Sequence, residues 1–193
     1  MKIFNSEKKN IVEIIKEGGV GIFPTDTLYG LVGSALSEKA VERIYKLKNR
    51  SEAKPFIILI SEIKHLKLFG VEVGKKEKSI LKKYWPGQIS IILDCPSLSK
   101  EMSYLRPFNN TLAFRCPSPK EIQSLLKQTG PLVAPSANPE DLPPAESIEQ
   151  ARAYFGEAVD FYVGDGQLSG EPSTIIKIGE NGFEIIRQGA TKI

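Results

Sequence analysis

The run FIILI at residues 56–60 consists entirely of large apolar residues. Such a run is typical of a strand in a sheet that is covered on both faces, because a half-solvated strand alternates apolar and polar residues. Other short β-forming runs recur along the chain between segments with helical spacing: VGIF (20–23), QISIIL (88–93), TLAFR (111–115), PLVA (131–134), VDFYV (159–163), STIIKI (173–178) and FEIIRQ (183–188). The pattern predicts a single α/β domain over residues 1–193, with a large, mostly mixed sheet and flanking helices.

Helix start and stop signals lie between these runs. In SPKE, we expect Ser118 to cap a helix, with Pro119 in its first position and Glu121 completing a capping box. Gly130 should end that helix. The other expected helices begin at the cap Ser6 and end at Gly18, begin near Ser37, span 75–84, and span 146–155. Residues 95–110 and the proline-rich loop PSANPEDLPPAE (135–146) are predicted to be irregular.

Charge is unevenly distributed along the chain. The net charge is only +3, which does not by itself indicate a nucleic-acid-binding protein. Residues 64–83 nevertheless hold seven lysines, whereas residues 139–171 hold eight acidic residues and one basic residue. One surface is therefore expected to be basic and another acidic. Two solvated helix faces would explain the same pattern, and a basic face would suit either tRNA or a protein partner.

The metal-ligating residues and the apolar content exclude several classes of protein. Cys95 and Cys116 fit no metal-binding spacing, and His65 is the one histidine, so no zinc site is expected. Both cysteines are predicted to be reduced core thiols. The N-terminal MKIFNSEKK lacks the apolar region of a signal peptide, and no run approaches the ~18 apolar residues of a spanning helix. We expect a cytoplasmic protein that does not bind a membrane.

The stretch KLKNRSEAKPF (46–56) places four cations just before the apolar run. These cations are Lys46, Lys48, Arg50 and Lys54. Arginine presents a planar fork that suits a carboxylate or phosphate, and lysine supplies a point charge. The stretch is therefore a candidate anion site. Cations are also favourable at the C-terminal end of a helix, so a solvated helix end remains an alternative.

The stretch PTDTLYG (24–30) follows the VGIF run and is rich in hydroxyl groups. Thr25, Thr27 and Tyr29 offer groups that donate and accept hydrogen bonds, and Asp26 is the only charge. A binding loop and a turn that caps itself through its Thr and Asp side chains are both consistent with this composition.

Polar residues also lie at the ends of three later runs. Thr111 and Arg115 share one face of TLAFR, and a buried arginine there requires a partner. Ser136 and Asn138 follow PLVA in the sequence APSAN, which also fits an ordinary turn. Arg187 follows an apolar run near the C-terminus. In open α/β sheets, ligands bind beyond strand ends, so these residues are expected to converge.

The chain contains no GxxxxGK[ST] P-loop, no GxSxG elbow and no kinase signature. Arginines and lysines instead flank hydroxyl-rich loops at the predicted strand ends. This composition suits a ligand with several negative groups, such as a nucleoside triphosphate beside a carboxylate.

An ordered set of motifs carries a family likeness over nearly the whole chain. The chain resembles the YrdC family, the threonylcarbamoyl-AMP synthases, and looks like the single-domain bacterial TsaC type. The motifs are PTDTLYGL (24–31), KNR (48–50), KPFIILI (54–60), YWPGQISIIL (84–93), TLAFRCP (111–117), GPLVAPSAN (130–138), PSTIIKI (172–178) and IIRQGA (185–190). The resemblance implies a twisted, YrdC-like mixed sheet with flanking helices around a basic cavity.

The resemblance also implies a reaction, in which L-threonine, bicarbonate and ATP give threonylcarbamoyl-AMP and pyrophosphate for the N6-threonylcarbamoyladenosine modification (t6A37) of tRNA. Mg²⁺ is expected to be bound mainly through the ATP phosphates; no metal-binding residue is assigned, and whether a side chain also contacts the ion is left open. A threonylcarbamoyltransferase complex is the implied protein partner, and direct tRNA binding is left open. No histidine base or covalent nucleophile is required, since positioning and charge neutralisation dominate such a reaction.

By the same resemblance, Lys48 and Arg50 carry the catalytic role. The implied ATP contacts are Lys48, Arg50, Lys54, Thr111, Ser136, Asn138 and Arg187, and the implied threonine contacts are Thr27, Arg115 and Ser136. Lys46 matches no family position and is expected to be solvated.

Three departures from the family pattern bear on these expectations. Leu59 stands where many relatives have histidine, and QGA follows Arg187 in place of the commoner PGx. The loop PEDLPPA replaces the usual small-residue loop after Asn138, and it places Glu140 and Asp141 near an anion site. The alternatives are a YrdC-fold paralogue that binds RNA or nucleotide without synthase activity, a carbamoyl-transfer module, and a plain tRNA-binding protein. The last is distinguished by a steep salt dependence and indifference to threonine.

Overall fold

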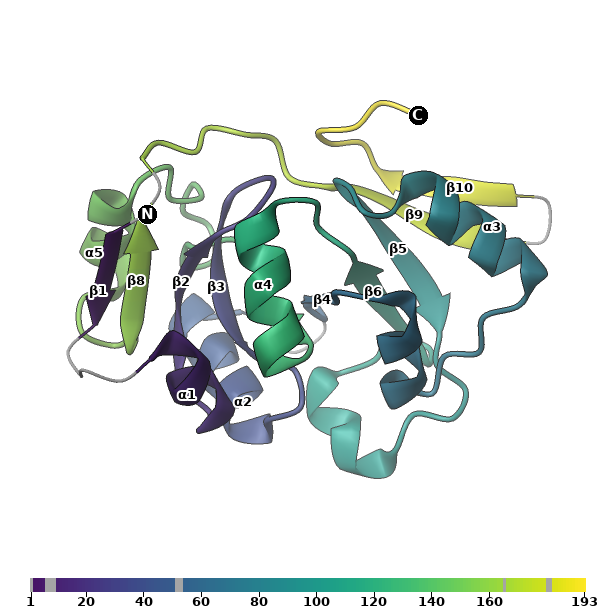
Figure 1. Cartoon of the computed structure of the whole chain (residues 1–193), viewed down its shortest axis with the longest axis horizontal. Coiled ribbons are helices and arrows are strands. Elements are labelled where there is room, and N and C mark those ends of the chain that lie inside the picture. The colour runs from purple at the N-terminus through teal and green to yellow at the C-terminus, as the bar shows by residue number, and fades with distance from the viewer. Residues whose placement is uncertain (1, 6–9, 51–53, 165, 180–181) are drawn as a thin grey trace.

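The structure is a computed structural model that describes residues 2–5, 10–50, 54–164, 166–179 and 182–193 (Figure 1). Its strands are β1 (Lys2–Asn5), β2 (Val20–Pro24), β3 (Tyr29–Ser34), β4 (Ile57–Leu59), β5 (Ile89–Asp94), β6 (Thr111–Arg115), β7 (Leu132–Val133), β8 (Phe161–Gly164), β9 (Thr174–Gly179) and β10 (Gly182–Arg187). Its helices are α1 (Ile11–Lys16), α2 (Glu38–Lys48), α3 (Lys75–Tyr84), α4 (Lys120–Thr129) and α5 (Ile148–Phe155), with 3₁₀ helices η1 (Ile63–Phe69) and η2 (Lys100–Leu105).

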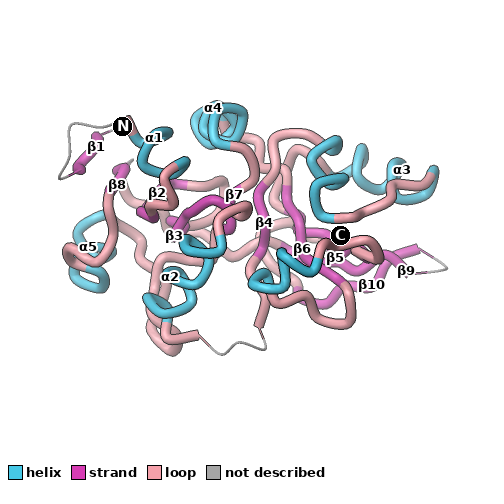
Figure 2. The backbone as a smooth tube through the Cα atoms, turned by 90° about the horizontal axis from the view of Figure 1, so that it is seen from below, coloured by secondary structure: helices cyan, strands magenta, loops and turns pink. Residues whose placement is uncertain are grey.

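The described strands form one sheet in the order β1-β8-β2-β3-β7-β4-β6-β5-β9-β10. The pairs β2–β8, β4–β6 and β5–β9 are parallel, and the other neighbouring pairs are antiparallel. The predicted mixed α/β sheet is therefore confirmed. Figure 2 shows the short strands β7 and β4 side by side in the middle of the molecule, where they join the two halves of the sheet.

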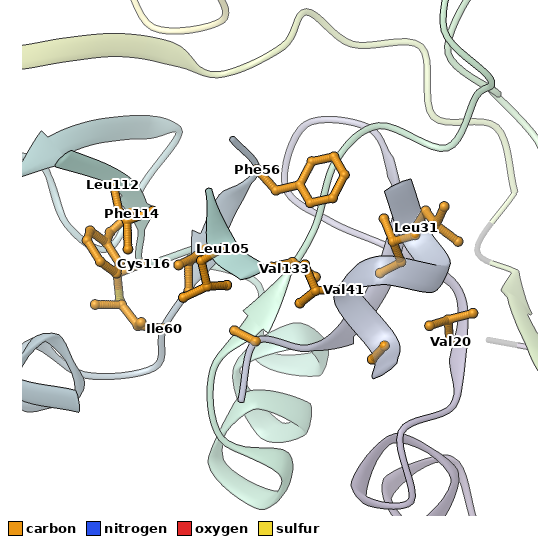
Figure 3. Close-up of a cluster of buried hydrophobic side chains, with 14 of the residues drawn as sticks. Val20, Leu31, Val41, Phe56, Ile60, Leu105, Leu112, Phe114, Cys116 and Val133 are labelled. Carbon is orange, nitrogen blue, oxygen red and sulfur yellow. The ribbon is translucent and has the colours of Figure 1, made fainter. Parts of the chain in front are cut away.

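The buried residues form two clusters, one for each face of the sheet. The smaller cluster packs α1 and α4 on the sheet through Ile14, Leu126 and Phe161. The larger cluster contains residues of α2, α3, α5 and both 3₁₀ helices, and part of it is drawn in Figure 3. In β4, Ile58 belongs to the larger cluster and Leu59 to the smaller one. The fully apolar run therefore has helices on both sides, as its composition predicts.

Cys95 and Cys116 are both free and buried, which agrees with their interpretation as core thiols. Burial raises the pKa of Cys95 to about 11 and also raises the pKa of Cys116. Each thiol is therefore held in its neutral form at ordinary pH.

Several predicted boundaries are wrong. Strand β3 was not predicted, because Tyr29 and Gly30 were assigned to a loop and glycine has low β-propensity. A Cβ at Gly33 would lie 3.0 Å from Ile44 Cδ1, so the missing side chain allows α2 to pack closely on β3. Strand β1 and η1 were also not predicted, and η2 lies in the segment 95–110 that was predicted to be irregular.

One predicted helix cap differs from the structure, and a second lies outside the described residues. Pro119 takes the cap position of α4 with ψ 140°, and no side chain caps this helix. Ser118 is therefore not the cap, because the extended Pro119 separates it from the first helical amides. The predicted cap Ser6 lies outside the described residues, and the described α1 has Asn10 as its cap, with its side chain accepting a hydrogen bond from the Val12 amide.

The segment from β8 to β9 runs across the molecule from one half of the sheet to the other (Figure 1). Tyr29 donates a hydrogen bond of 2.7 Å to the Gly166 carbonyl at its start. A Cβ at Gly170 would lie 2.3 Å from the Thr27 carbonyl oxygen, so glycine permits the chain to lie directly on the β2–β3 turn. The residues after β10 are held against the same segment by the Ala190 amide, which donates to the Pro172 carbonyl.

None of the helices in the described part of the chain combines the length and the apolar character that crossing a membrane requires.

Candidate anion-binding site

A cavity of about 370 Å³ opens where strand ends from several parts of the chain meet. Its lining comes from the β2–β3 turn, the segment before β4, strand β6, the loop after β7 and the pair β9–β10. Five of the predicted site residues line it: Thr27, Arg50, Arg115, Ser136 and Arg187. The predicted convergence of these five residues is thus present in the structure. The lining residues that the structure describes include three arginines and no carboxylate.

The hydroxyl groups of the two threonines in the β2–β3 turn have different hydrogen-bond partners. The Thr25 hydroxyl donates to the Leu28 carbonyl at 2.7 Å and accepts from the amides of Thr27 and Leu28 at 3.2 and 3.3 Å. Thr25 therefore caps the turn, as the structural alternative for this stretch predicts. The Thr27 hydroxyl instead accepts a hydrogen bond of 3.1 Å from Arg115 Nη1. Thr27 thus belongs to both the turn and the cavity wall.

Arg115 extends from the end of β6 into the wall of the cavity, and its side chain is only 5% exposed. Its Nη2 lies 3.4 Å from Oδ1 of Asp26, which is the partner that a buried arginine requires. Burial lowers the pKa of Arg115, and the Asp26 charge opposes that change. Asp26 stands out in the sequence as the only charge in PTDTLYG, but the sequence does not indicate that Arg115 is its partner.

Arg50 and Arg187 approach the cavity from two different elements. Arg50 Nε donates to the Lys54 carbonyl at 3.1 Å, and its guanidinium lies 5.5 Å from the centre of the Phe56 ring. Arg187 Nη2 donates to the Ser173 carbonyl at 2.8 Å. Burial lowers the pKa of Arg187, and the positive charge of Arg50 lowers it further. The two cations therefore repel each other, and an anion between them would relieve that repulsion.

Lys48 does not line the cavity. Its side chain is buried under the loop after β7, where Nζ donates to the carbonyls of Ser136 at 2.7 Å and Asn138 at 2.6 Å, and to Asn138 Oδ1 at 3.2 Å. Burial lowers its pKa to about 8, as does nearby Arg50, whereas Glu140 acts in the opposite direction. Contact with a phosphate would require Lys48 to leave these three oxygens. Its role as an ATP contact remains a prediction.

Three other predicted site residues also lie outside the cavity lining. Asn138 accepts from the Ser136 hydroxyl at 2.6 Å and donates to the carbonyls of Pro139 and Leu142, so it shapes the loop. Thr111 lies at the far end of β6 from Arg115 and donates to the Phe108 carbonyl at 2.7 Å. Lys54 is exposed and directly precedes Pro55, which lines the cavity, so Lys54 is at its rim. These residues also remain predictions as ATP contacts.

The acidic loop after Asn138 reaches the cationic segment, as the departure from the family pattern suggested. Glu140 Oε1 lies 2.7 Å from Lys54 Nζ, and the Glu140 amide donates to the Lys48 carbonyl at 2.6 Å. The loop that follows Ser136 is thus joined to the segment that carries Arg50 by both a main-chain hydrogen bond and an ion pair.

The described residues contain no group of three or more His, Cys, Asp or Glu that is placed to hold a metal ion. The cavity lining offers arginine forks and hydroxyl groups, which suit anionic oxygens and not a bare cation. A divalent cation would fit this donor set only when its ligands come from a bound phosphate chain.

Together, the sheet and the cavity define an α/β protein with an arginine-lined site for an anionic ligand at its strand ends. A family model described as "Telomere recombination", which covers the Sua5, YciO and YrdC proteins, matches residues 13–189. The chain belongs to this family.

Curated relatives agree with this assignment. A threonylcarbamoyl-AMP synthase of Pyrococcus abyssi is 30% identical over 177 residues, which are 91% of this chain and 52% of the relative. A threonylcarbamoyl-AMP synthase of Hahella chejuensis is 31% identical over 167 residues, which are 85% of this chain and 89% of the relative. The chain thus spans about half the length of the Pyrococcus relative and most of the Hahella relative.

Solved structures show the same fold. Pyrococcus abyssi Sua5 complexed with L-threonine matches with a TM-score of 0.81 and 29% identity, covering 92% of this chain and 52% of that one. YciO of E. coli matches with a TM-score of 0.81 at 24% identity, covering 94% of this chain and 88% of that one. The second likeness concerns the fold alone.

Proposed function

We propose that this protein is an L-threonylcarbamoyladenylate synthase that converts L-threonine, bicarbonate and ATP into threonylcarbamoyl-AMP and pyrophosphate. The observation that carries the proposal is the convergence of Thr27, Arg115, Ser136, Arg50 and Arg187 on one cavity. These residues come from separate segments of the chain, and the family resemblance of the sequence assigns each of them to ATP or threonine. The names of the relatives and the L-threonine bound to Pyrococcus Sua5 support the same function.

The geometry suits two neighbouring anionic groups. Arg115, held by Thr27 and Asp26, would bind the carboxylate or carbamate of the amino acid. Arg50 and Arg187 would bind the phosphates, which would also relieve their mutual repulsion. Since the reacting partners are both anions, holding them together and neutralising their charge is the main contribution that these side chains make.

The reaction then needs no covalent intermediate with the protein. The threonine amine captures bicarbonate with loss of water, which gives a carbamate. A carbamate oxygen attacks the α-phosphate of ATP, and pyrophosphate leaves. Mg²⁺ would be held by phosphate oxygens, because no carboxylate is among the described residues that line the cavity.

The proposal includes the partners that this product requires. Threonylcarbamoyl-AMP would pass to a threonylcarbamoyltransferase complex, which would place the group on adenosine 37 of tRNA. The proposed compartment is the cytoplasm, where ATP and tRNA are both present.

The test is pyrophosphate release from ATP in the presence of bicarbonate and magnesium, measured with and without L-threonine. The adenylate is identified by mass in the same mixture. Arg50→Ala should lose about tenfold to a hundredfold or more of the threonine-dependent rate, because one charge-assisted contact is worth ~1.5–3 kcal/mol. Arg152→Ala is the control, since Arg152 is exposed on α5 against Tyr162 and lies outside the cavity lining.

Pyrophosphate release that does not depend on threonine, in a folded protein that binds ATP, would contradict the proposal. It would favour the alternative of a paralogue that binds nucleotide or RNA without making the adenylate.

A further inference from the structure

Asp26 is a buried charge that the proposed reaction does not use. Its side chain is 3% exposed, and neither carboxylate oxygen has a hydrogen-bond partner in the described structure. The charge nearest to it is Arg115, whose Nη2 lies 3.4 Å from Oδ1. The main-chain amides of Asp26 and Ser118 stabilise the charged carboxylate without meeting hydrogen-bond geometry. Such a buried carboxylate is costly, so a compensating role is expected.

Asp26 is not among the described residues that line the anion site, although its neighbour Thr27 is. A second cavity of about 370 Å³ is lined by Asp26, Thr27 and Gln88 on one side and by residues 168–171 on the other. Thr27 lines both cavities, whereas Arg115 lines the first cavity and Asp26 the second. The Asp26 side chain is almost fully buried, so Asp26 lines the second cavity through its main chain, and its carboxylate lies buried beside the Arg115 guanidinium.

Two polar contacts hold the Arg115 guanidinium in place. Nη1 donates to the Thr27 hydroxyl, and Nη2 faces the Asp26 carboxylate. Arg115 Nε has no hydrogen-bond partner in the described structure, so no third contact fixes the orientation of the fork. Thr27 and Asp26 are adjacent in sequence, so one turn supplies both contacts.

Asp26 also carries a negative charge close to the positive charge of Arg115. Arg187 adds a positive charge near Arg115 and lowers its pKa, whereas Asp26 raises it. Burial raises the pKa of Asp26, and Arg115 opposes that change. Asp26 thus compensates part of the charge of the buried Arg115, whereas Arg187 is exposed and would meet the phosphates.

We propose that Asp26 is a positioning residue that holds the Arg115 fork toward the anion site, where the fork binds the carboxylate of the amino acid. The inference rests on the proposed function and assigns Asp26 a part in amino-acid binding, separate from ATP binding. It follows that loss of the Asp26 charge weakens the binding of threonine and leaves the binding of ATP almost unchanged.

The experiment compares Asp26→Asn with wild type in the pyrophosphate assay. Asparagine keeps the shape of the side chain and removes its charge. The KM for L-threonine should rise about tenfold to a hundredfold, which corresponds to loss of one charged contact, while the KM for ATP stays within about twofold. Asp160→Asn is a matched control, because Asp160 pairs with Arg43 at 2.6 Å away from both cavities. It should leave both KM values unchanged.

A double-mutant cycle tests whether Asp26 acts through Arg115. Adding Asp26→Asn to Arg115→Gln should change the KM for threonine by less than about twofold, because the residue that Asp26 positions is already gone. Additive effects of the two substitutions, or an equal rise in both KM values for Asp26→Asn alone, would overturn the inference.

Two further measurements cover the cases in which the first variant fails. If Asp26→Asn does not fold, Asp26→Glu keeps the charge and moves the carboxylate by one methylene. A raised KM for threonine alone supports the inference, and an unchanged one refutes it. If wild type has no threonine-dependent activity, the proposed function fails. In that case a crystal structure of Asp26→Asn, or of Asp26→Glu if Asp26→Asn does not fold, shows whether Asp26 positions Arg115. Arg115 leaving the Thr27 hydroxyl supports that role, and Arg115 staying there overturns it.

Discussion

Replacing Lys48 with methionine tests whether this residue holds the loop that carries Ser136. Methionine has a similar length and is apolar, so the packing around α2 is retained. The ammonium is lost, together with its hydrogen bonds to the Ser136 carbonyl, the Asn138 carbonyl and Asn138 Oδ1.

The expected loss of stability depends on which hydrogen bonds each of the three oxygens keeps in the variant. The Ser136 carbonyl still accepts from the Asn138 amide at 3.0 Å, and Asn138 Oδ1 still accepts from the Ser136 hydroxyl at 2.6 Å. The Asn138 carbonyl loses the one hydrogen bond that joins it to Lys48. An unsatisfied buried carbonyl costs ~1–3 kcal/mol, and charge-assisted hydrogen bonds are worth ~1.5–3 kcal/mol. These losses are partly offset, because the variant no longer pays the free energy of burying the lysine charge. We expect a net loss of about 2–4 kcal/mol.

The assay is calorimetric unfolding at pH 7. For a chain of this length, 1 kcal/mol shifts Tm by about 2–4 °C, so Lys48→Met should lower Tm by about 4–16 °C. Lys46→Met is the control, because Lys46 is an exposed residue in the same last turn of α2. A Tm for Lys48→Met within 1 °C of this control would refute the reasoning.

The pH dependence of the same variant gives a second check. Burial lowers the pKa of Lys48 to about 8, whereas an unfolded lysine titrates near ~10.4. Between these values the unfolded chain binds more protons than the folded chain, so the Lys48 contribution to the free energy of unfolding rises with pH. Below pH 8 both states are protonated and the contribution is constant. The stability difference between wild type and Lys48→Met should therefore grow from pH 8 to pH 10.

Two further predictions concern the turn and the rim of the site. Gly170→Ala should raise the KM for threonine and lower Tm, because the added Cβ would lie 2.3 Å from the Thr27 carbonyl oxygen and must displace the chain. Gly179→Ala is the control and should change neither quantity, because a Cβ at Gly179 meets no atom within 4 Å. Equal Tm values for the two variants would contradict this. Glu140→Gln should lower the KM for ATP by about two- to fivefold, because the rim lysine loses its carboxylate partner, and exposed ion pairs are worth ~0.2–1 kcal/mol. Asp141→Asn keeps a residue that tolerates the φ of 70° and should leave this KM unchanged, so an equal effect of both variants would exclude the ion pair as the cause.

The sequence predicted the regular parts of the fold because the patterns there are local. The apolar run 56–60 indicates cover on both faces, and helices do cover β4 on both faces. Strand β3 was missed because Gly30 and Gly33 weaken its pattern, and its stability comes from pairing with β2 and β7. Such tertiary pairing overrides local propensity and leaves no mark in the strand itself.

The candidate site was predicted in its composition but not in its connections. Arg115 and Arg187 lie on the cavity, as residues at strand ends should, and Arg50 reaches it from the segment after α2. The direction of the Lys48 side chain was not predictable, because its partners are carbonyl oxygens and every residue has one. The Asp26–Arg115 pair was missed for a related reason. The sequence shows that a buried arginine needs a partner but does not say which carboxylate the sheet brings to it.

The order of the strands also has a consequence for how the protein forms during synthesis. Thr27 lies near the N-terminus, whereas Arg187 lies in β10, which pairs with β9, which in turn pairs with β5. Contacts between segments so distant in sequence form slowly and after local ones, since the chain must first close a long loop. A growing polypeptide on the ribosome therefore carries most of the sheet before it has a complete binding site. Ligand can stabilise this protein only after β9 and β10 have left the ribosomal tunnel and paired.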